Sequence, residues 1–410
     1  MNNTPELLSP AGDLDKMRFG IAYGADAVYM AGTRFGMRAA ATNFDDNALR
    51  EGIAYAHAHG VKCYITVNIM PSNRDLPALP AYLELLQDAG ADALIIADVG
   101  VLRMARRYAP KVPVHISTQT SILNHEAANY WADEGAERIV LARELSLEEI
   151  AEIRAKTPKE LEIEAFVHGA MCISYSGRCL ISQYMTGRDA NHGACAQPCR
   201  WNYSLMEEKR PGQFFPVEED GRGTYLYNSK DMCMIEHVPE LIEAGITSFK
   251  IEGRNKTAYY AACVTGAYRA AIDTYKKDPE NFVLPQFCRD EVNKVSHREY
   301  YTGFYFGNQE NGQHYGDSQY IREYEVVGMP VECDDSGKAV FALKNRFFDG
   351  EELELIQPGQ APYVFRAENV TDDEGTKREL FNVPQMRVHF VFPFKVSEWA
   401  ILRKVKERPE

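Results

Sequence analysis

The sequence predicts an α/β fold, with a (β/α)8 TIM-barrel-like domain over residues 1–317 and a small all-β, barrel-like domain over residues 318–410. Helical patterns alternate with short apolar runs, as expected for helices between buried parallel strands. A motif of glycine, a small or apolar residue and a hydrophobic run recurs through the first part of the chain. After about residue 318 the pattern changes to alternating apolar and polar residues with turn signals at DDSG and DG, which indicates a β domain.

The recurring motif appears as YGADAVYMAG, HGVKCYITVN, AGADALIIAD, EGAERIVLAR and AGITSFKIEG. Most copies follow an amphipathic segment, so the glycine ends a helix and the apolar run forms a buried strand. Three further runs, PELLSPA, VPVHISTQ and LEIEAFVHG, fit the same series. The expected strands lie near residues 5–10, 26–31, 62–68, 92–97, 113–119, 137–142, 161–168 and 247–252. Eight strands favour a closed barrel, and a doubly wound open sheet is the alternative.

The barrel predicts where chemistry occurs, because active sites of this architecture lie at the carboxyl ends of the strands. The polar residues expected at those ends are Asn68, Asp98, Gln119, Arg143, His168, Glu252 and Arg254. A cysteine-rich excursion over residues 169–226 starts after the seventh strand, on the same face. Loops of this length in compact domains are usually functional. The segment AYYAACVTGAYRAAIDTY, residues 258–275, is expected to be the closing helix.

Composition restricts the class of protein. The chain has a formal net charge of −14, which argues against a general electrostatic attraction to nucleic acid but leaves room for a local basic patch. No apolar run reaches the length of a transmembrane helix. The start of the chain lacks the basic and apolar regions of a secretory signal, so we expect a cytoplasmic protein. Cysteines clustered in a reducing compartment indicate metal binding or catalysis.

Four of the nine cysteines fall within 28 residues, with the spacing Cys-x6-Cys-x15-Cys-x3-Cys. They are Cys172, Cys179, Cys195 and Cys199. The spacing differs from zinc ribbons and from the tight ferredoxin run, yet four thiolates suit either an iron–sulfur cluster or zinc. The simpler alternative is packing, which we expect for Cys63, Cys263 and Cys288. Cys233 is a substitute fourth ligand or a buried residue on a helix after Asp231.

The run E-x-F-x-H-G-A-x-C-x6-C-x-x-S, from Glu164 to Ser182, resembles the signature of the U32 family, long described as collagenase-like peptidases. ELLSPAG near the start, NSKD at residues 228–231 and KIEGR at residues 250–254 extend the resemblance over essentially the whole chain. Within the family the chain looks most like the tRNA hydroxylation protein P branch. Members of that branch help to make 5-hydroxyuridine at the wobble position of tRNA, with prephenate as the hydroxyl source and without oxygen.

The resemblance implies a [4Fe-4S] cluster on the four clustered cysteines, with Cys199 and Cys233 as the two candidates for fourth ligand. It implies tRNA as the macromolecular partner, prephenate as a dicarboxylate cosubstrate, and room for a second U32 protein as a partner. Two other classes stay open: a peptidase, and a noncatalytic iron–sulfur protein that binds RNA or assists assembly. The sequence lacks the His-Glu-x-x-His and Gly-x-Ser-x-Gly motifs of common peptidases.

A dianion such as prephenate is best bound by arginine, whose planar guanidinium pairs with a carboxylate through two hydrogen bonds. We expect Arg143 and Arg254 to form this clamp, with Arg38 and Arg178 in reserve. The expected catalytic residues are Arg143, His168, Glu252 and Arg254. The expected substrate-binding residues are Asn68, Gln119, Glu164 and Arg178. Each of these is open to a plainer role in a salt bridge or on the surface.

Two groups of residues outside the strand ends are candidates for RNA contact. The first is a set of aromatic residues that could stack bases or pack around a cluster: Tyr175, Tyr184, Trp201 and Tyr203. The second is a pair of basic stretches in the C-terminal domain, KNRFF at residues 344–348 and ILRKVKER at residues 401–408. The plainer alternative for the second pair is a solvated edge strand and a tail.

Overall fold

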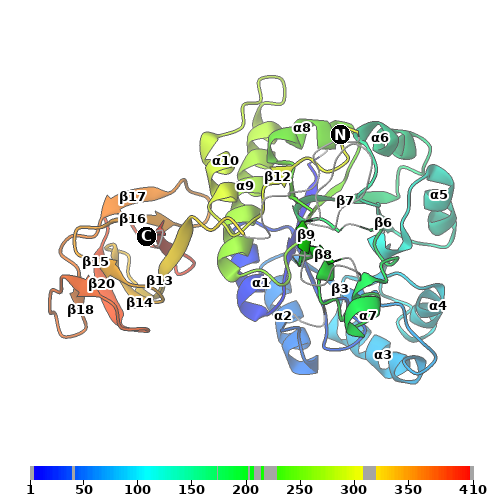
Figure 1. Ribbon diagram of the computed structural model, residues 1–410, viewed down its shortest axis with the longest axis horizontal. Helices are drawn as coiled ribbons and strands as arrows, with labels where there is room; N and C mark the ends of the chain where they lie inside the picture. The colour runs from blue at the N-terminus through cyan, green and yellow to red at the C-terminus, as the bar shows by residue number, and fades with distance from the viewer. Residues whose placement is uncertain are drawn as a thin grey trace.

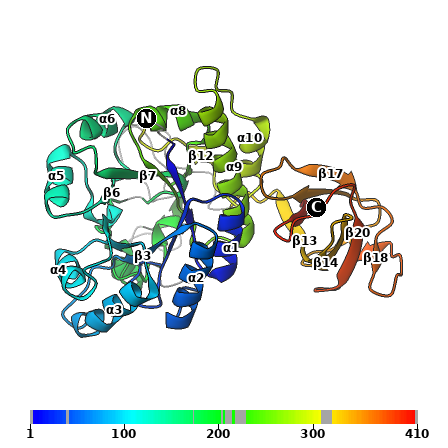
Figure 2. The same ribbon diagram turned by 180° about the vertical axis from the view of Figure 1, so that it is seen from behind.

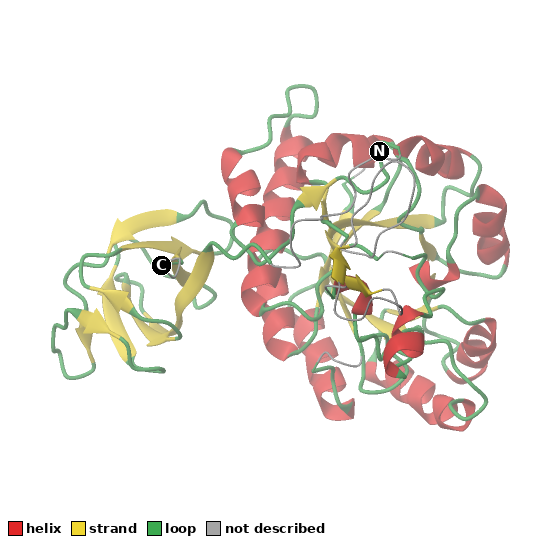
Figure 3. Cartoon of the chain, viewed as in Figure 1, coloured by secondary structure: helices red, strands yellow, loops and turns green. Residues whose placement is uncertain are grey.

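The computed structural model describes residues 4–38, 42–172, 174–201, 204–206, 214–216, 229–307 and 320–406. In this part of the chain a ring of helices surrounds a barrel of strands, and a β domain stands beside it (Figure 1, Figure 3). No helix of the described chain is long and apolar enough to cross a membrane.

The barrel is closed and parallel. Its strands follow one another in chain order and the ring closes where β11 pairs with β7. The eight strands are β1 (Glu6–Pro10), β2 (Ala27–Met30), β3 (Lys62–Val67), β4 (Ala93–Ile96), β5 (Val114–Ile116), β6 (Arg138–Val140), β7 (Glu162–Ala170) and β11 (Ser248–Ile251). Each coincides with a predicted strand, so the closed barrel is confirmed and the doubly wound sheet is wrong. Gln119 lies beyond β5, on the 3-10 helix η2 (Thr118–Thr120).

The helices form the outer layer and bury their apolar faces against the strands. They are α1 (Leu14–Ala22), α2 (Asp46–Ala58), α3 (Leu79–Ala89), α4 (Val99–Tyr108), α5 (His125–Asp133), α6 (Leu147–Ala155), α7 (Ile181–Thr186), α8 (Val238–Glu243), α9 (Ala258–Lys277) and α10 (Gln286–Asn293). Side chains cap the first turn of several helices. Asp98 caps α4, and Ser146 forms a capping box with Glu149 at the start of α6. Gly90 ends α3 at φ 83°, as expected for a glycine after a helix. The closing helix, α9, begins at the predicted residue.

Two short strands extend the sheet beyond the barrel. The end of β7 pairs in antiparallel fashion with β10 (Asp231–Cys233), so that Cys233 lies opposite His168. Strand β12 (Tyr300–Tyr301) then pairs with β10. The alternative that placed Cys233 on a helix after Asp231 is therefore wrong. The backbone of this segment forms its hydrogen bonds with the end of β7 instead. A separate hairpin joins β8 (Ser204–Met206) to β9 (Phe214–Pro216).

The C-terminal domain is an antiparallel sheet in the order β17-β16-β21-β13-β14-β20-β18, with a second pair β15-β19. Its strands are β13 (Tyr324–Cys333), β14 (Lys338–Leu343), β15 (Phe347–Phe348), β16 (Glu352–Ile356), β17 (Tyr363–Arg366), β18 (Thr371–Asp372), β19 (Leu380–Phe381), β20 (Arg387–Val391) and β21 (Ile401–Val405). Aromatic residues fill its own core, where Phe347 stacks on Phe381 with ring centroids 4.8 Å apart. The predicted all-β character is confirmed.

The two domains meet along α1, α9 and α10 (Figure 1, Figure 2). Trp399 packs edge-on against Phe19 at 5.3 Å between ring centroids, and its carbonyl accepts a hydrogen bond from the Tyr23 hydroxyl at 3.0 Å. Arg403 of β21 reaches across to Glu291 of α10. These contacts combine apolar burial with a buried ion pair, so they hold the β domain against one side of the barrel.

Candidate functional site

A cavity of about 800 Å³ opens at the carboxyl ends of the barrel strands. Its volume is in the range of small-molecule sites. Three parts of the chain line it: the barrel mouth with the start of α9, the cysteine-rich segment, and the inner edge of the C-terminal domain. The cavity therefore lies where the barrel architecture predicts chemistry and continues to the second domain.

Glu252, at the end of β11, is the centre of charge in this cavity. One of its carboxylate oxygens lies 3.7 Å from an Nη2 of Arg38 and 3.7 Å from an Nη2 of Arg143. Burial opposes ionisation of Glu252, but the cations of Arg38, Arg143 and Arg254 outweigh it and hold the pKa of Glu252 below its usual value. Three guanidinium groups thus act on one carboxylate, which leaves an excess of positive charge for an anionic ligand.

The arginines are held in place by the barrel. Arg143 donates through Nη1 to the carbonyl of Ala170 at 2.8 Å and lies 3.9 Å from the ring centroid of Phe166. Arg254 donates to the carbonyl of Met37. The Nε of Arg143 and the Nη1 of Arg254 are buried and have no hydrogen-bond partner among the described residues. Buried donors normally find an acceptor, but neither Arg143 nor Arg254 lines the cavity, so a ligand oxygen would reach these nitrogens only after neighbouring side chains move.

The cysteine-rich segment covers one side of the mouth. Cys172, Cys195 and Cys199 line the cavity, whereas Cys179 does not. Glu252 foremost, and then the thiols of Cys172 and Cys195, raise the pKa of Arg38, which places those thiols beside the arginine group. In the described part of the chain, however, no three histidine, cysteine, aspartate or glutamate side chains are arranged to hold a metal ion.

Backbone and side-chain hydrogen bonds fasten this segment to the barrel. The amide of Met70 donates to the carbonyl of Asn191 at 3.0 Å, and Ser121 Oγ donates to the carbonyl of Ser176 at 3.2 Å. Gly177 has φ 76°, and a Cβ at this position would lie 2.8 Å from the carbonyl oxygen of Gln119. Only glycine fits such a close approach in the left-handed region. The barrel mouth thus positions the cysteines.

Cys233 lies apart from the cavity. It belongs to β10 and packs against the main apolar core. Burial raises the pKa of its thiol to about 12. Cys199 lines the cavity and Cys233 does not, which favours Cys199 as the fourth thiol of the clustered set.

His168 is buried within a cage of Tyr260, Tyr268 and Tyr300, and it does not line the cavity. Its Nε2 lies 3.3 Å from the Tyr300 hydroxyl. Burial, together with the nearby charges of His297 and Lys256, lowers the pKa of His168 to about 3. The imidazole is therefore neutral, and it shapes the wall behind the cavity.

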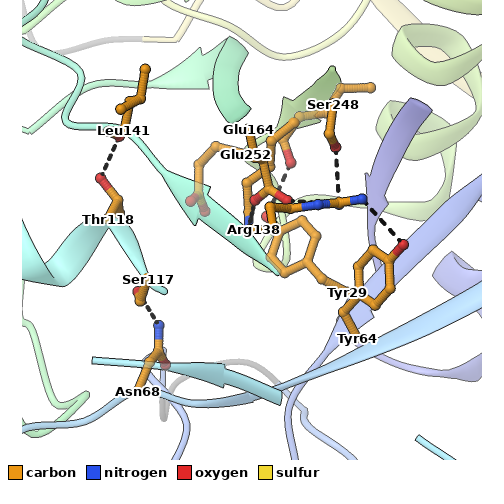
Figure 4. A network of polar contacts seen from close by, with 12 residues as sticks. Tyr29, Tyr64, Asn68, Ser117, Thr118, Arg138, Leu141, Glu164, Ser248 and Glu252 are labelled. Carbon is orange, nitrogen blue, oxygen red and sulfur yellow. Dashed lines mark hydrogen bonds and ion pairs between the residues drawn. The ribbon is translucent and has the colours of Figure 1, made fainter. Parts of the chain in front are cut away.

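Glu164 belongs to β7 and lies beside Arg138 among the barrel strands (Figure 4). It is fully buried and pairs with Lys250 at 2.5 Å and with Arg138 at 3.1 Å. Arg138 also binds Glu6 and the Ser248 hydroxyl. This network neutralises charge within the barrel, and Glu164 does not line the cavity.

Asn68 and Gln119 form a second polar group at the mouth. Asn68 accepts from the amide of Met37 and donates to Ser117 Oγ at 3.1 Å, as drawn in Figure 4. The Oε1 of Gln119 is buried without a partner among the described residues. Both lie beneath the cysteine-rich segment and outside the cavity lining.

The other predicted side chains of the cysteine-rich segment face solvent. Arg178 is exposed and does not line the cavity. Tyr184 is 93% exposed, and Tyr175 and Trp201 are each 44% exposed. Tyr203 lies outside the described residues.

Sequence reasoning missed the cavity residues supplied by α9 and by the link between the domains. Lys256, Tyr259 and Tyr260 line the cavity from the barrel side, and Tyr320 and Arg322 line it where the chain enters the second domain. The pattern of α9 shows only an apolar face, so nothing in it distinguishes Tyr260 from a core residue. The basic stretch KNRFF was a usable signal, because Lys344 lines the same cavity.

Comparisons with known proteins agree with this architecture. Residues 12–315 match "Peptidase family U32", and residues 322–403 match "Peptidase family U32 C-terminal domain". The "tRNA hydroxylation protein P1" of Bacillus subtilis (strain 168) is 39% identical over 98% of this chain and 95% of that protein. The "tRNA hydroxylation protein P" of Escherichia coli (strain K12) is 37% identical over 90% of each chain.

A further relative has a related name. The "23S rRNA 5-hydroxycytidine C2501 synthase" of Escherichia coli (strain K12) is 40% identical over 80% of this chain and 48% of that protein. With the barrel, the cysteine-rich segment and the C-terminal sheet all matched, the chain belongs to the U32 peptidase family and carries the C-terminal domain of that family.

Proposed function

We propose that this chain is a cytoplasmic enzyme that hydroxylates the wobble uridine of tRNA at C5, with prephenate as the oxygen-independent source of the hydroxyl group. Two relatives that span nine tenths or more of the chain are named for tRNA hydroxylation. A third is named for making a 5-hydroxypyrimidine in ribosomal RNA. All three names concern a hydroxylated product in RNA, and one of them names a 5-hydroxypyrimidine.

The observation that carries the proposal is the arginine group around Glu252. Prephenate has two carboxylates. Arg38 and Glu252 line the cavity, whereas Arg143 and Arg254 are buried outside its lining and act on it through the Glu252 carboxylate. A dianion placed here gains charge-assisted hydrogen bonds from preorganised groups. The cavity volume of about 800 Å³ leaves space for a nucleobase beside such an acid.

Glu252 has a charge-balancing role in this proposal. Its lowered pKa keeps it ionised at neutral pH and makes it a weak base. It holds Arg38 and Arg143 in place until the dianion arrives, and then shares them with the ligand. The exposed fraction of the Arg143 side chain is only 7%, so water screens the attraction between Arg143 and Glu252 only weakly.

We further propose that a [4Fe-4S] cluster is held by Cys172, Cys179, Cys195 and Cys199. All four belong to the segment fastened over the mouth, and three line the cavity. Soft thiolates are the usual ligands of iron–sulfur clusters, which supply one-electron chemistry when bound. The cysteine-rich segment would have to tighten to bring the four sulfurs together; zinc on the same thiols is the alternative.

Peptidase chemistry has less support. A cysteine peptidase needs a thiolate within hydrogen-bond reach of a histidine base. Among the described residues, His168 is enclosed by tyrosines, and its strand neighbour Cys233 has a raised pKa. Neither residue lines the cavity.

The test is nucleoside analysis by mass spectrometry of tRNA from a strain that lacks this gene and carries the wild-type chain or a variant. We expect wild type to restore 5-hydroxyuridine, and Arg38→Gln and Arg143→Gln each to lower it by roughly a hundredfold, as for other preorganised transition-state donors. Arg106→Gln is the matched control, because Arg106 pairs with Glu134 on the outer surface. Normal 5-hydroxyuridine in the double variant Arg38→Gln/Arg143→Gln, at equal protein level, would refute the proposal.

A further inference from the structure

The cavity extends from the arginine group to the C-terminal domain, and its lining differs in charge from the rest of the chain. The charged side chains that line it are Arg38, Lys256, Arg322, Lys344, Lys406, Glu252 and Glu325. Five cations against two carboxylates give an excess of three positive charges, on a chain with a net charge of −14. An acidic protein with one basic cleft concentrates polyanions at that cleft.

The cations stand on two facing walls. Arg38 and Lys256 belong to the barrel, whereas Arg322, Lys344 and Lys406 belong to the C-terminal domain and its entry strand. Lys344 and Lys406 are exposed, and neither side chain has an ion-pair partner among the described residues. Two nearby cations of β21 differ from these lysines, because Arg403 and Lys404 each form an ion pair with a glutamate. Two lysines that have no ion-pair partner in the described part of the chain therefore line the cleft.

Aromatic rings line the path between the walls. Tyr320 is held at the cleft by cations on its ring, with Lys256 at 4.4 Å and Arg298 at 4.7 Å from the centroid. Tyr259, Tyr260 and Tyr324 line the same cavity. Phosphate-binding cations with aromatic rings between them are the usual elements of a surface that binds single-stranded RNA.

We propose that this interdomain cleft binds the backbone of the single-stranded loop of the RNA substrate, and that Lys344 and Lys406 contact its phosphates. The inference rests on the proposed function for the identity of the RNA and adds where it binds. A nucleotide whose base enters the arginine end of the cavity would have its flanking phosphates between the two walls. The C-terminal domain is then the second half of the RNA-binding site.

The experiment measures binding of a fluorescently labelled tRNA anticodon stem–loop to the full-length chain by anisotropy, over a range of salt concentrations. For Lys344→Gln/Lys406→Gln we expect affinity at 0.1 M salt to fall on the order of tenfold. The slope of log K against log salt should become shallower by about 1.4, or about 0.7 for each lost contact with a single strand. Lys276→Gln/Lys277→Gln, at the exposed end of α9, removes the same charge away from the cleft and should bind like wild type.

Two results would overturn the inference: unchanged affinity and slope in the cleft variant, or competition by polyglutamate as strong as that by RNA. Calorimetry with prephenate separates the cleft from the arginine group, since both lysine variants should bind the dianion like wild type. If the wild-type chain binds the stem–loop but never restores 5-hydroxyuridine in cells, the proposed function is refuted, whereas the inference that the cleft binds RNA is still supported. If Lys344→Gln/Lys406→Gln makes 5-hydroxyuridine normally and its RNA affinity is unchanged, the RNA-binding inference is refuted while the proposed function stands.

Discussion

Arg403 and Glu291 form a two-pronged ion pair across the domain boundary, with Nη1 of Arg403 2.6 Å from Oε2 of Glu291 and Nη2 2.5 Å from Oε1. Arg403 is fully buried and also binds Glu354 of its own domain. The guanidinium thus bridges one carboxylate from each domain. This bridge fixes the wall of the cleft that carries Lys344 and Lys406.

Arg403→Met should destabilise the chain strongly, because it removes the buried guanidinium between Glu291 and Glu354 and leaves Lys294 as their shared cation among the described residues. Breaking a buried pair from one side typically costs about 3–5 kcal/mol. Urea unfolding measures the change. Arg387→Met is the control: Arg387 pairs with Glu332 and Asp373 on the surface, where solvent screens the charges, so the unfolding midpoint should barely move. Equal midpoints for the two variants would show that the bridge contributes no more than a surface pair.

Glu252→Gln should strengthen dianion binding, because the ligand no longer competes with a carboxylate for Arg38 and Arg143. We expect prephenate affinity to rise by roughly tenfold, equivalent to about 1.4 kcal/mol, in calorimetry at neutral pH. Glu148→Gln, at the exposed first turn of α6, is the control. Weaker binding in Glu252→Gln would mean that Glu252 orders the arginines more than it opposes the ligand.

The same carboxylate makes stability depend on pH. The folded pKa of Glu252 is lowered from 4.5, so its contribution to stability is complete above pH 4.5 and is lost as the pH falls through the folded value. Acid unfolding followed by circular dichroism should therefore show a smaller loss of stability below pH 4.5 in Glu252→Gln than in wild type. A parallel decline in both proteins would contradict this assignment.

His168 should make stability fall on mild acidification. Its folded pKa is about 3 against a usual 6.5, so between these values the unfolded chain takes up a proton that the folded chain does not. Between pH 7 and pH 5 wild type should lose about 2 kcal/mol more unfolding free energy than His168→Gln, at 1.36 kcal/mol per pKa unit. His59→Gln changes an exposed histidine and should lose as much as wild type. Identical pH profiles for wild type and His168→Gln would show that folding does not lower the pKa of His168.

Iron content tests the thiol assignment. Anaerobically purified wild type should hold about four irons with a broad absorption band near ~400 nm, as [4Fe-4S] proteins do. Cys172→Ala, Cys195→Ala and Cys199→Ala should lose them, whereas Cys233→Ala should keep them, because Cys233 packs in the core. Loss of iron in Cys233→Ala with retention in Cys199→Ala would reverse the assignment of the fourth ligand. Zinc in place of iron would contradict the cluster proposal.

Much of the site could be predicted from the order of strands. A carboxyl strand end in a barrel faces the mouth whatever the details of packing, so Arg143, Glu252 and Arg254 were predictable together. The direction in which a side chain points near a strand end could not be predicted from the strand order. His168 lies where the β7 pairing with β11 shifts register and where Gly169 adopts φ 105°, and there it turns toward α9 instead of the cavity. Glu164 lies four residues earlier on the same strand, and its side chain pairs with Lys250 inside the barrel.

The sequence by itself determined the barrel, because parallel strands buried on both faces must be apolar runs that follow glycine-ended helices. It also determined which segment carries the thiols. Only the tertiary structure decided that Arg38 shares a carboxylate with Arg143, that Cys233 is excluded from the cavity, and that Lys256 and Lys344 line the same cavity. These are relations between residues far apart in the chain, and packing between elements fixes them. Periodicity and composition describe each element alone.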